Sequence, residues 1–394
     1  MTKKYNFLQG IRDFLIITLV FALMPINSDL YLTSLPAITT DFIVNINYTQ
    51  FTLSVFLIGL CPSLLIFGCL SDLFGRSRPL FWGLFINIIG NVCCWLAPNI
   101  YLLCLGRFIQ GFGLGVTPGL ARAMLRDLYE KEQLALYNSY LGLITVIIVS
   151  LTPLAGSYVQ QYIGWRSNFL LLAVFTIIIL YLFYKNIPET NPSLKNKNIV
   201  KTLRYTLLFL LRHFKILRFA LCSLLTYGGI IAWYIEAPVV LQQQIGISSI
   251  KCGWLYIYPG IGFLLGGVLN VKLIYRLRID SIIMLGLILQ LISGCMLLCF
   301  FILKLMNVVT IVAPIVPFMI GASLIIPNCA VKVLTPFPHI AGAAGAIFEF
   351  SKILGGIFTS SAMAFLGDEN LLPVAFIFIL FSLFSIFICS VQEK

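Results

Sequence analysis

The sequence predicts an all-α polytopic membrane protein with twelve transmembrane helices. Of its 394 residues, 60% are hydrophobic and 10% are charged, whereas about 25% of the residues in a soluble globular chain are charged. A helix needs about 20 apolar residues to cross a bilayer, and runs of this kind recur along the whole chain. The basic residues also gather in alternate loops between these runs, as expected for a chain that crosses a membrane repeatedly.

The twelve predicted spans follow one another through short loops. Their approximate bounds are 12–34, 48–70, 80–97, 101–124, 135–159, 167–184, 217–241, 252–271, 281–303, 308–331, 340–366 and 371–390. The longest polar stretch, rich in Lys, Asn, Pro and Ser, falls between spans six and seven. We therefore expect an N-terminal six-helix bundle over 1–184, a cytoplasmic linker over 185–218 and a C-terminal six-helix bundle over 219–394.

The net charge of +12 reflects membrane topology rather than nucleic-acid binding. Lys and Arg occur in alternate loops, at 3–12, 76–78, 122–131, 185–218, 272–278 and 332, whereas the loops 35–47 and 98–100 contain neither. Basic loops stay on the cytoplasmic side, so this asymmetry predicts that both termini are cytoplasmic. The linker can also contact anionic lipid.

The residue types that carry most enzyme chemistry are missing or scattered. Most of the eleven cysteines lie inside predicted spans, where they act as small apolar residues, and no paired spacing predicts a metal site. The chain has no G-x-x-x-x-G-K-[ST] phosphate loop and no set of residues for a nucleophilic enzyme. We therefore expect a secondary transporter that uses a proton gradient and no cofactor.

Away from the cytoplasmic ends of the predicted spans, the candidates for isolated charges are Asp29, Arg107, Glu236, Glu349 and Lys352. A charge near the bilayer centre costs at least about 2.5 kcal/mol, so each should face a wet cavity or a partner. Structural explanations also stay open. The two outer acids could lie at a shallow interface, the arginine could extend to the surface, and the last two residues, three apart on a helix, could pair only with each other.

Two motifs indicate a family. The segment GCLSDLFGRSR at 68–78 resembles the loop motif G-x-L-[SA]-D-[RK]-x-G-R-[RK] of the major facilitator superfamily, although Leu73 and Ser77 replace basic residues. The matching positions are Gly68, Leu70, Ser71, Asp72, Gly75 and Arg76. The segment RFIQGFGLG resembles the R-x-x-Q-G-x-G motif of proton antiporters through Arg107, Gln110 and Gly111. A weaker match, LTPLAGSY, keeps Pro153 and Gly156 of a further antiporter motif.

Longer segments resemble the Bcr/CflA branch of this superfamily, typified by bicyclomycin-resistance drug:proton antiporters. They are SDLYLTSLPAI, ARAMLRDLY, TPLAGSYVQQYIGWRSNF and APVVLQQQIGISSIKCGW. This resemblance covers nearly the whole chain and implies a major facilitator fold, with two six-helix halves around a central cavity lined by spans one, four, seven and ten. Asp29 matches the acidic residue of the branch in span one. Glu236, Glu349 and Lys352 depart from its small or neutral residues, which favours a polar or charged substrate.

The expected function is proton-coupled export of small molecules by a monomer in the cytoplasmic membrane of a bacterium. The expected partners are the substrate, protons and the lipid bilayer. Proton coupling is assigned to Asp29, Arg107, Glu236 and Glu349, and the cavity to these four with Tyr31, Gln110, Trp233 and Lys352. The sequence is also compatible with export of an endogenous metabolite such as a carboxylate siderophore, with nutrient import, and with a non-transporting sensor or scaffold.

Overall fold

The computed structural model describes residues 7–129, 131–190, 214–336, 341–366 and 370–390, and all regular structure in these ranges is helical. Most of the predicted linker, at 191–213, lies outside them. The N-terminal half contains α1 (Phe7–Asp29), η1 (Leu32–Ser34), α2 (Leu35–Phe42), α3 (Ile46–Phe74), α4 (Ser77–Trp95), α5 (Ile100–Leu114), α6 (Val116–Leu128), α7 (Lys131–Tyr162) and α8 (Arg166–Asn186). The C-terminal half contains α10 (Phe214–Val239), η2 (Val240–Gln244), α11 (Ser249–Leu255), α12 (Ile257–Leu273), α13 (Ile279–Ile302), α14 (Val308–Val312), α15 (Ile315–Leu334), α16 (Ala341–Leu366) and α17 (Leu372–Ser390).

The helices account for the predicted spans. Within the ranges that the structure describes, ten helical segments are long and apolar enough to cross a membrane. Two further helices, α4 and α16, pack lengthwise against them: α4 contacts α5 and α8, and α16 contacts α10 and α3. These two occupy the positions of predicted spans three and eleven. The prediction of an all-α polytopic fold is therefore confirmed.

Several spans consist of two helical pieces. The fourth begins where the side chain of Asn99 caps α5 by accepting a hydrogen bond from the backbone N–H of Leu102, which satisfies one of the free amides at a helix start. It is interrupted at Gly115, between α5 and α6. The tenth is interrupted next to Pro314, between α14 and α15, because proline lacks the amide that would continue the helix.

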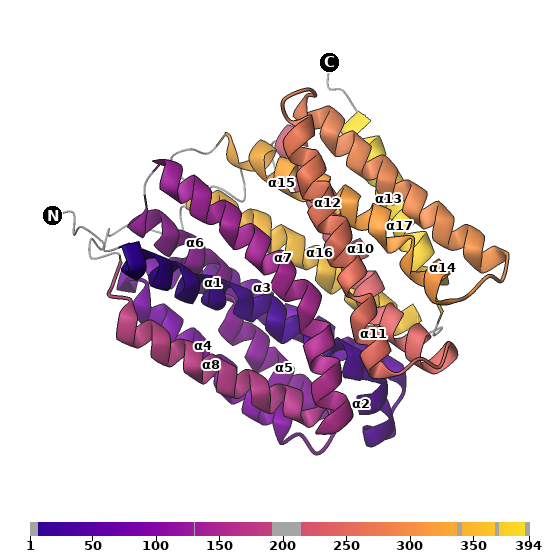
Figure 1. The fold of residues 1–394 in the computed structure, drawn as a ribbon, viewed down its shortest axis with the longest axis horizontal. Helices are drawn as coiled ribbons and strands as arrows, with labels where there is room; N and C mark the ends of the chain where they lie inside the picture. Colours follow the sequence, from indigo (N-terminus) through magenta and orange to yellow (C-terminus); the bar gives the residue numbers. More distant parts are fainter. Residues whose placement is uncertain (1–6, 130, 191–213, 337–340, 367–369, 391–394) are drawn as a thin grey trace.

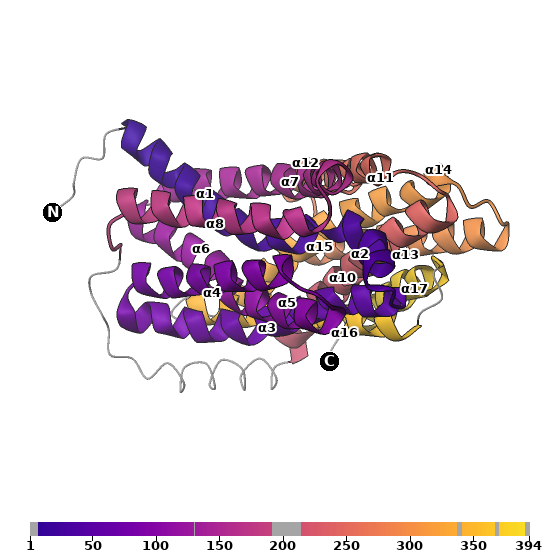
Figure 2. The ribbon, with the colours of Figure 1, turned by 90° about the horizontal axis from the view of Figure 1, so that it is seen from below.

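The two halves lie side by side, indigo to magenta and orange to yellow (Figure 1). They meet along two contact regions, α3 against α16 and α7 against α11 and α12. Figure 2 shows that these regions lie on opposite sides of the bundle, with α10 and α15 between them. We call the boundary between the halves the seam.

One end of the bundle collects the basic loops. The hydroxyl of Tyr129, just after α6, donates to the carbonyl of Gly10 at the start of α1, and Arg76 reaches Asp127 on α6. In the other half, Lys332 at the end of α15 pairs with Asp280 at the start of α13. We call this the basic end, and we call the end that contains α2 and η2 the opposite end.

Candidate functional site

Arg107 on α5 lies at the centre of the N-terminal half with no solvent exposure. Its Nη1 donates to the backbone carbonyl of Asn27, at 3.0 Å, and to the side-chain oxygen of Gln110. Its guanidinium carbon lies 4.1 Å from the ring centre of Tyr31 and 4.4 Å from that of Phe56. Nε and Nη2 donate no hydrogen bond within the described chain. The side chain therefore does not extend to the surface, and one edge of the guanidinium is free.

A cluster of buried amides orients this arginine. The Asn27 side-chain oxygen accepts hydrogen bonds from Gln110 at 2.9 Å and from Asn87 and Asn91 at 3.3 Å each. Gln110 also donates to Asn91 at 2.7 Å, and Thr176 donates to Asn87 at 3.1 Å. The cluster joins α1, α4, α5 and α8, so it holds Gln110 where it can accept from the arginine. Satisfied networks of this kind make a buried arrangement rigid.

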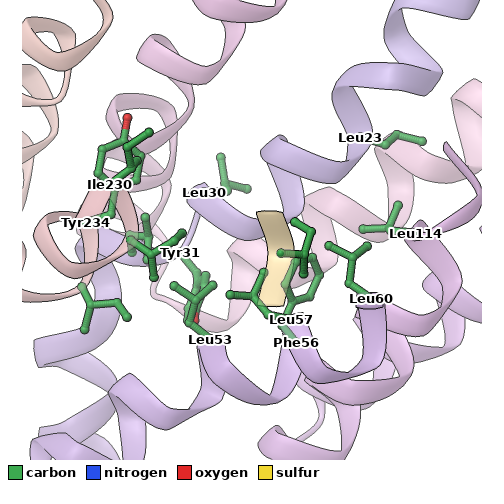
Figure 3. Packing of buried hydrophobic residues seen from close by; sticks show 14 of the residues in the cluster. Leu23, Leu30, Tyr31, Leu53, Phe56, Leu57, Leu60, Leu114, Ile230 and Tyr234 are labelled. Carbon is green, nitrogen blue, oxygen red and sulfur yellow. The ribbon is translucent and has the colours of Figure 1, made fainter. Parts of the chain in front are cut away.

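Asp29 ends α1 and is 7% exposed. Its carboxylate accepts a hydrogen bond from the Ser28 hydroxyl at 2.5 Å. Asp29 follows Asn27, whose backbone carbonyl binds Arg107, by two residues, and the two charges form no ion pair among the described residues. Figure 3 shows Leu30 and Tyr31, which follow Asp29, in one hydrophobic cluster with Tyr234 of the C-terminal half. In this conformation side chains therefore fill the seam at this level.

Glu236 of α10 lies at the seam, and Trp233 lies one turn earlier on the same helix. Glu236 is 3% exposed, and its carboxylate accepts a hydrogen bond from the Gln50 side chain of α3 at 3.0 Å. Trp233 is buried, with its indole N–H 3.5 Å from the carbonyl of Ile311, and its ring packs against Tyr256. The two acids assigned to proton coupling at this depth thus come from different halves.

Glu349 and Lys352 form a separate cluster on α16, toward the basic end. Lys352 Nζ lies 2.5 Å from Glu349 Oε2, so the two residues form the ion pair that the sequence left open as a structural explanation. Arg122 of α6 adds a second cation, with Nη1 3.2 Å from Glu349 Oε1. Lys352 Nζ also lies 5.5 Å from the ring centre of Tyr227.

The structure thus brings Asp29, Tyr31, Arg107 and Gln110 together, places Trp233 and Glu236 across the seam, and keeps Glu349 and Lys352 apart from them. The roles assigned to these residues stay predictions. Sequence reasoning missed Asn27, Asn87, Asn91, Gln50 and Tyr227, and it treated Arg122 only as a loop charge. Asparagines inside apolar runs were an available signal, because a buried amide requires a partner.

The loop motif between α3 and α4 forms a compact junction at the basic end. Arg76 Nε lies 3.1 Å from Asp127 Oδ2, and its Nη1 donates to the Ser71 hydroxyl at 3.0 Å. Gly75 has φ +84°, a value that favours glycine. The Glu189 carboxylate accepts hydrogen bonds from the backbone N–H of Arg76 at 2.7 Å and from that of Ser77 at 3.0 Å. Gly68 faces open space, and the side chain of Asp72 lies outside the described set.

The remaining motif residues bring helices into close contact. A Cβ on Gly111 would lie 2.0 Å from the carbonyl oxygen of Phe56, and one on Gly156 would lie 1.7 Å from that of Leu30. The carbonyl of Pro153, within α7, accepts a hydrogen bond from the Thr33 hydroxyl at 3.4 Å. These contacts fix the positions of the backbone segments next to Tyr31 and Phe56, whose rings pack on Arg107.

Residues 17–360 match the family model described as Major Facilitator Superfamily. The chain belongs to this superfamily. An uncharacterized transporter of Rickettsia bellii is 30% identical over 341 residues, which cover 84% of this chain and 83% of that protein. A bicyclomycin resistance protein homolog of Haemophilus influenzae is 23% identical and covers 90% of this chain and 89% of its own.

A crystal structure of a D-xylose–proton symporter matches the fold with a TM-score of 0.77 at 19% identity, over 95% of this chain and 97% of that one. This match confirms the major facilitator fold, and the similarity to the Haemophilus influenzae protein confirms the resemblance to the bicyclomycin-resistance branch. The chain is a multi-pass membrane transporter and not an enzyme, as predicted.

Proposed function

We propose that this protein is a proton-coupled exporter of small polar or charged molecules that works by alternating access. The similarity to a protein named for bicyclomycin resistance favours export of antibiotics or related compounds over nutrient import or a non-transporting role. The chain also lacks a phosphate-loop motif, so an ion gradient is the natural energy source. Each charge that moves down a membrane potential of 100 mV supplies about 2.3 kcal/mol.

The free edge of Arg107 is the observation that carries this proposal. A fully buried guanidinium with two nitrogens lacking a partner is unfavourable unless a negative group approaches it during the working cycle. The Asp29 carboxylate is two residues from Asn27, whose carbonyl already binds the arginine. In our mechanism Asp29 alternates between binding a proton and interacting with the arginine, and substrate binding displaces the proton.

Alternating access requires the halves to move about the seam. The bundles 1–184 and 219–394 are the moving parts, and the helix contacts of α3 with α16 and of α7 with α12 are the surfaces along which they rock. We propose that the basic end faces the cytoplasm, because basic loops are retained on that side. The protein would then act as a monomer in a bacterial cytoplasmic membrane, with both termini inside and no cofactor.

Proton release on substrate binding tests this proposal directly. Purified protein in weakly buffered detergent solution is mixed with each compound of an antibiotic panel, and an indicator dye follows the pH. We expect release with the wild type and none with Asp29→Asn, which keeps the shape of the side chain but cannot titrate. Antiport is wrong if no compound releases protons and Asp29→Asn confers normal resistance in cells.

An untargeted comparison of metabolites in cells and medium, with and without the gene, separates drug export from export of an endogenous metabolite. Accumulation of one cellular compound inside the cells lacking the gene, with unchanged drug susceptibility, would favour the second role.

A further inference from the structure

Arg122 and Glu349 form an ion pair that joins the two halves near the basic end. Arg122 belongs to α6 of the N-terminal half and Glu349 to α16 of the C-terminal half, and their Nη1 and Oε1 atoms are 3.2 Å apart. The arginine side chain is 53% exposed and the glutamate 18% exposed. Any motion that opens the seam at this end must therefore break the ion pair between the half-exposed Arg122 and the mostly buried Glu349.

Lys352 is a partner of a different kind. It lies on the same helix as Glu349, three residues later, with Nζ 2.5 Å from Oε2 and a side chain that is 15% exposed. Because residues three apart share one face of a helix, this pair moves as a unit with α16. Glu349 thus has one counter-charge that travels with it and one that belongs to the other half.

This arrangement makes the bond between the halves easy to break. A mostly buried carboxylate that loses its partner is strongly unfavourable. With Lys352 in place, Glu349 keeps a counter-charge when Arg122 leaves, and the half-exposed arginine gains water. The resident lysine therefore lowers the cost of the open state, whereas the arginine stabilises the closed one.

The opposite end is held by contacts of another type. Gln50 donates to Glu236 at 3.0 Å and Gln242 donates to the carbonyl of Thr33 at 2.9 Å, both across the seam. In the described chain the halves are therefore bonded at both ends, by hydrogen bonds from glutamine side chains at one and by a partly exposed ion pair at the other.

We propose that Arg122 and Glu349 form a gate at the basic end and that Lys352 is the resident counter-ion of this gate. The proposal rests on the alternating-access motion proposed above. It explains why an acid and a base stand three residues apart within an apolar span, and it assigns Lys352 to holding Glu349 charged rather than to binding the substrate.

The test is a distance measurement across the basic end in full-length protein in detergent micelles. Arg126 on α6 and Thr335 at the end of α15, both exposed, are each replaced by p-acetylphenylalanine, which carries the spin label. Because the label reacts with the ketone of this residue and not with thiols, the native cysteines stay in place. Pulsed electron resonance then gives the populations of short and long distances, which report the closed and open gate.

Arg122→Gln and Glu349→Gln should each raise the ratio of open to closed gate by about three- to fivefold, the range of a partly exposed ion pair. Lys352→Met should shift the ratio the other way, because Glu349 then has a partner only in the closed state. The double variant Glu349→Gln/Lys352→Met should behave like Glu349→Gln. Lys332→Met is the matched control, since it breaks an ion pair within one half, and it should leave the ratio unchanged.

The gate is overturned if Arg122→Gln matches the Lys332→Met control, or if Lys352→Met shifts the ratio in the same direction as Glu349→Gln. The Arg122 side chain is half-exposed, so Arg122→Gln should fold. It therefore tests the gate even if the glutamate variants fail to fold. Failure of the proposed function looks different: the distances would still respond to these substitutions while no compound releases protons.

Discussion

Substituting Gly156 by alanine tests whether the close contact between α7 and the end of α1 positions the residues around Arg107. Gly156 lies in α7, where a Cβ would fall 1.7 Å from the carbonyl oxygen of Leu30. Contacts of a Cβ below 3.0 Å essentially never occur, so α7 and the end of α1 must separate by at least 1.3 Å (3.0 minus 1.7). The atom in the way belongs to the backbone and cannot rotate aside as a flexible side chain could.

The expected cost follows from this displacement. Forcing an extra methyl group into a packed contact typically destabilises a protein by about 1–3 kcal/mol. Leu30 also stands between Asp29 and Tyr31, and Tyr31 stacks on the guanidinium of Arg107. We therefore expect Gly156→Ala to lower both the thermal stability and the proton coupling of the transporter.

The matched control is Gly142→Ala on the same helix, where nothing lies within 4 Å of the added Cβ. This change should be neutral, or stabilising by up to about 1 kcal/mol, because alanine favours helix over glycine. Both variants are purified in detergent and compared by thermal aggregation and by proton release. Equal stability of Gly156→Ala and Gly142→Ala would refute the close approach of α7 and α1.

Three further substitutions test other parts of the site. Arg107→Lys keeps the charge but loses the planar fork that stacks on aromatic rings, so resistance in cells should fall sharply at normal expression; retained resistance would mean that a point charge suffices. Asn91→Ala removes a partner of Gln110 and should cost about 1–3 kcal/mol in stability, measured by thermal aggregation, with no loss if the amide cluster is dispensable. Gln50→Ala removes a donor to Glu236 and should lengthen spin-label distances across the opposite end; unchanged distances would contradict its role in closing that end.

The spans and the basic end were predictable because both signals are local. A run of apolar residues is helical in a bilayer whatever its neighbours are, and the distribution of Lys and Arg sets the orientation of each loop. The interruption at Gly115 falls on the last residue of the RFIQGFGLG segment.

The site was predictable only in part. Arg107, Gln110 and Gly111 stood out through their motif, and Asp29 through its charge. Their partners did not stand out. Asn87, Asn91 and Thr176 are far from these residues in the chain, and nothing local distinguishes them from other polar residues within apolar runs. The pairing of Glu349 with Lys352 followed from their spacing of three residues, whereas the approach of Arg122, 227 positions earlier in the chain, did not.

The amino-acid sequence alone therefore determined the all-α membrane class and the presence of charges that must be paired or solvated. Those properties depend on hydropathy and on helical spacing, which act over a few turns. Only the tertiary structure decided which partner each charge has. Among the described residues it left two nitrogens of Arg107 without a hydrogen-bond partner, bonded Glu236 to Gln50 and joined Glu349 to the opposite half, because such contacts depend on how distant helices pack.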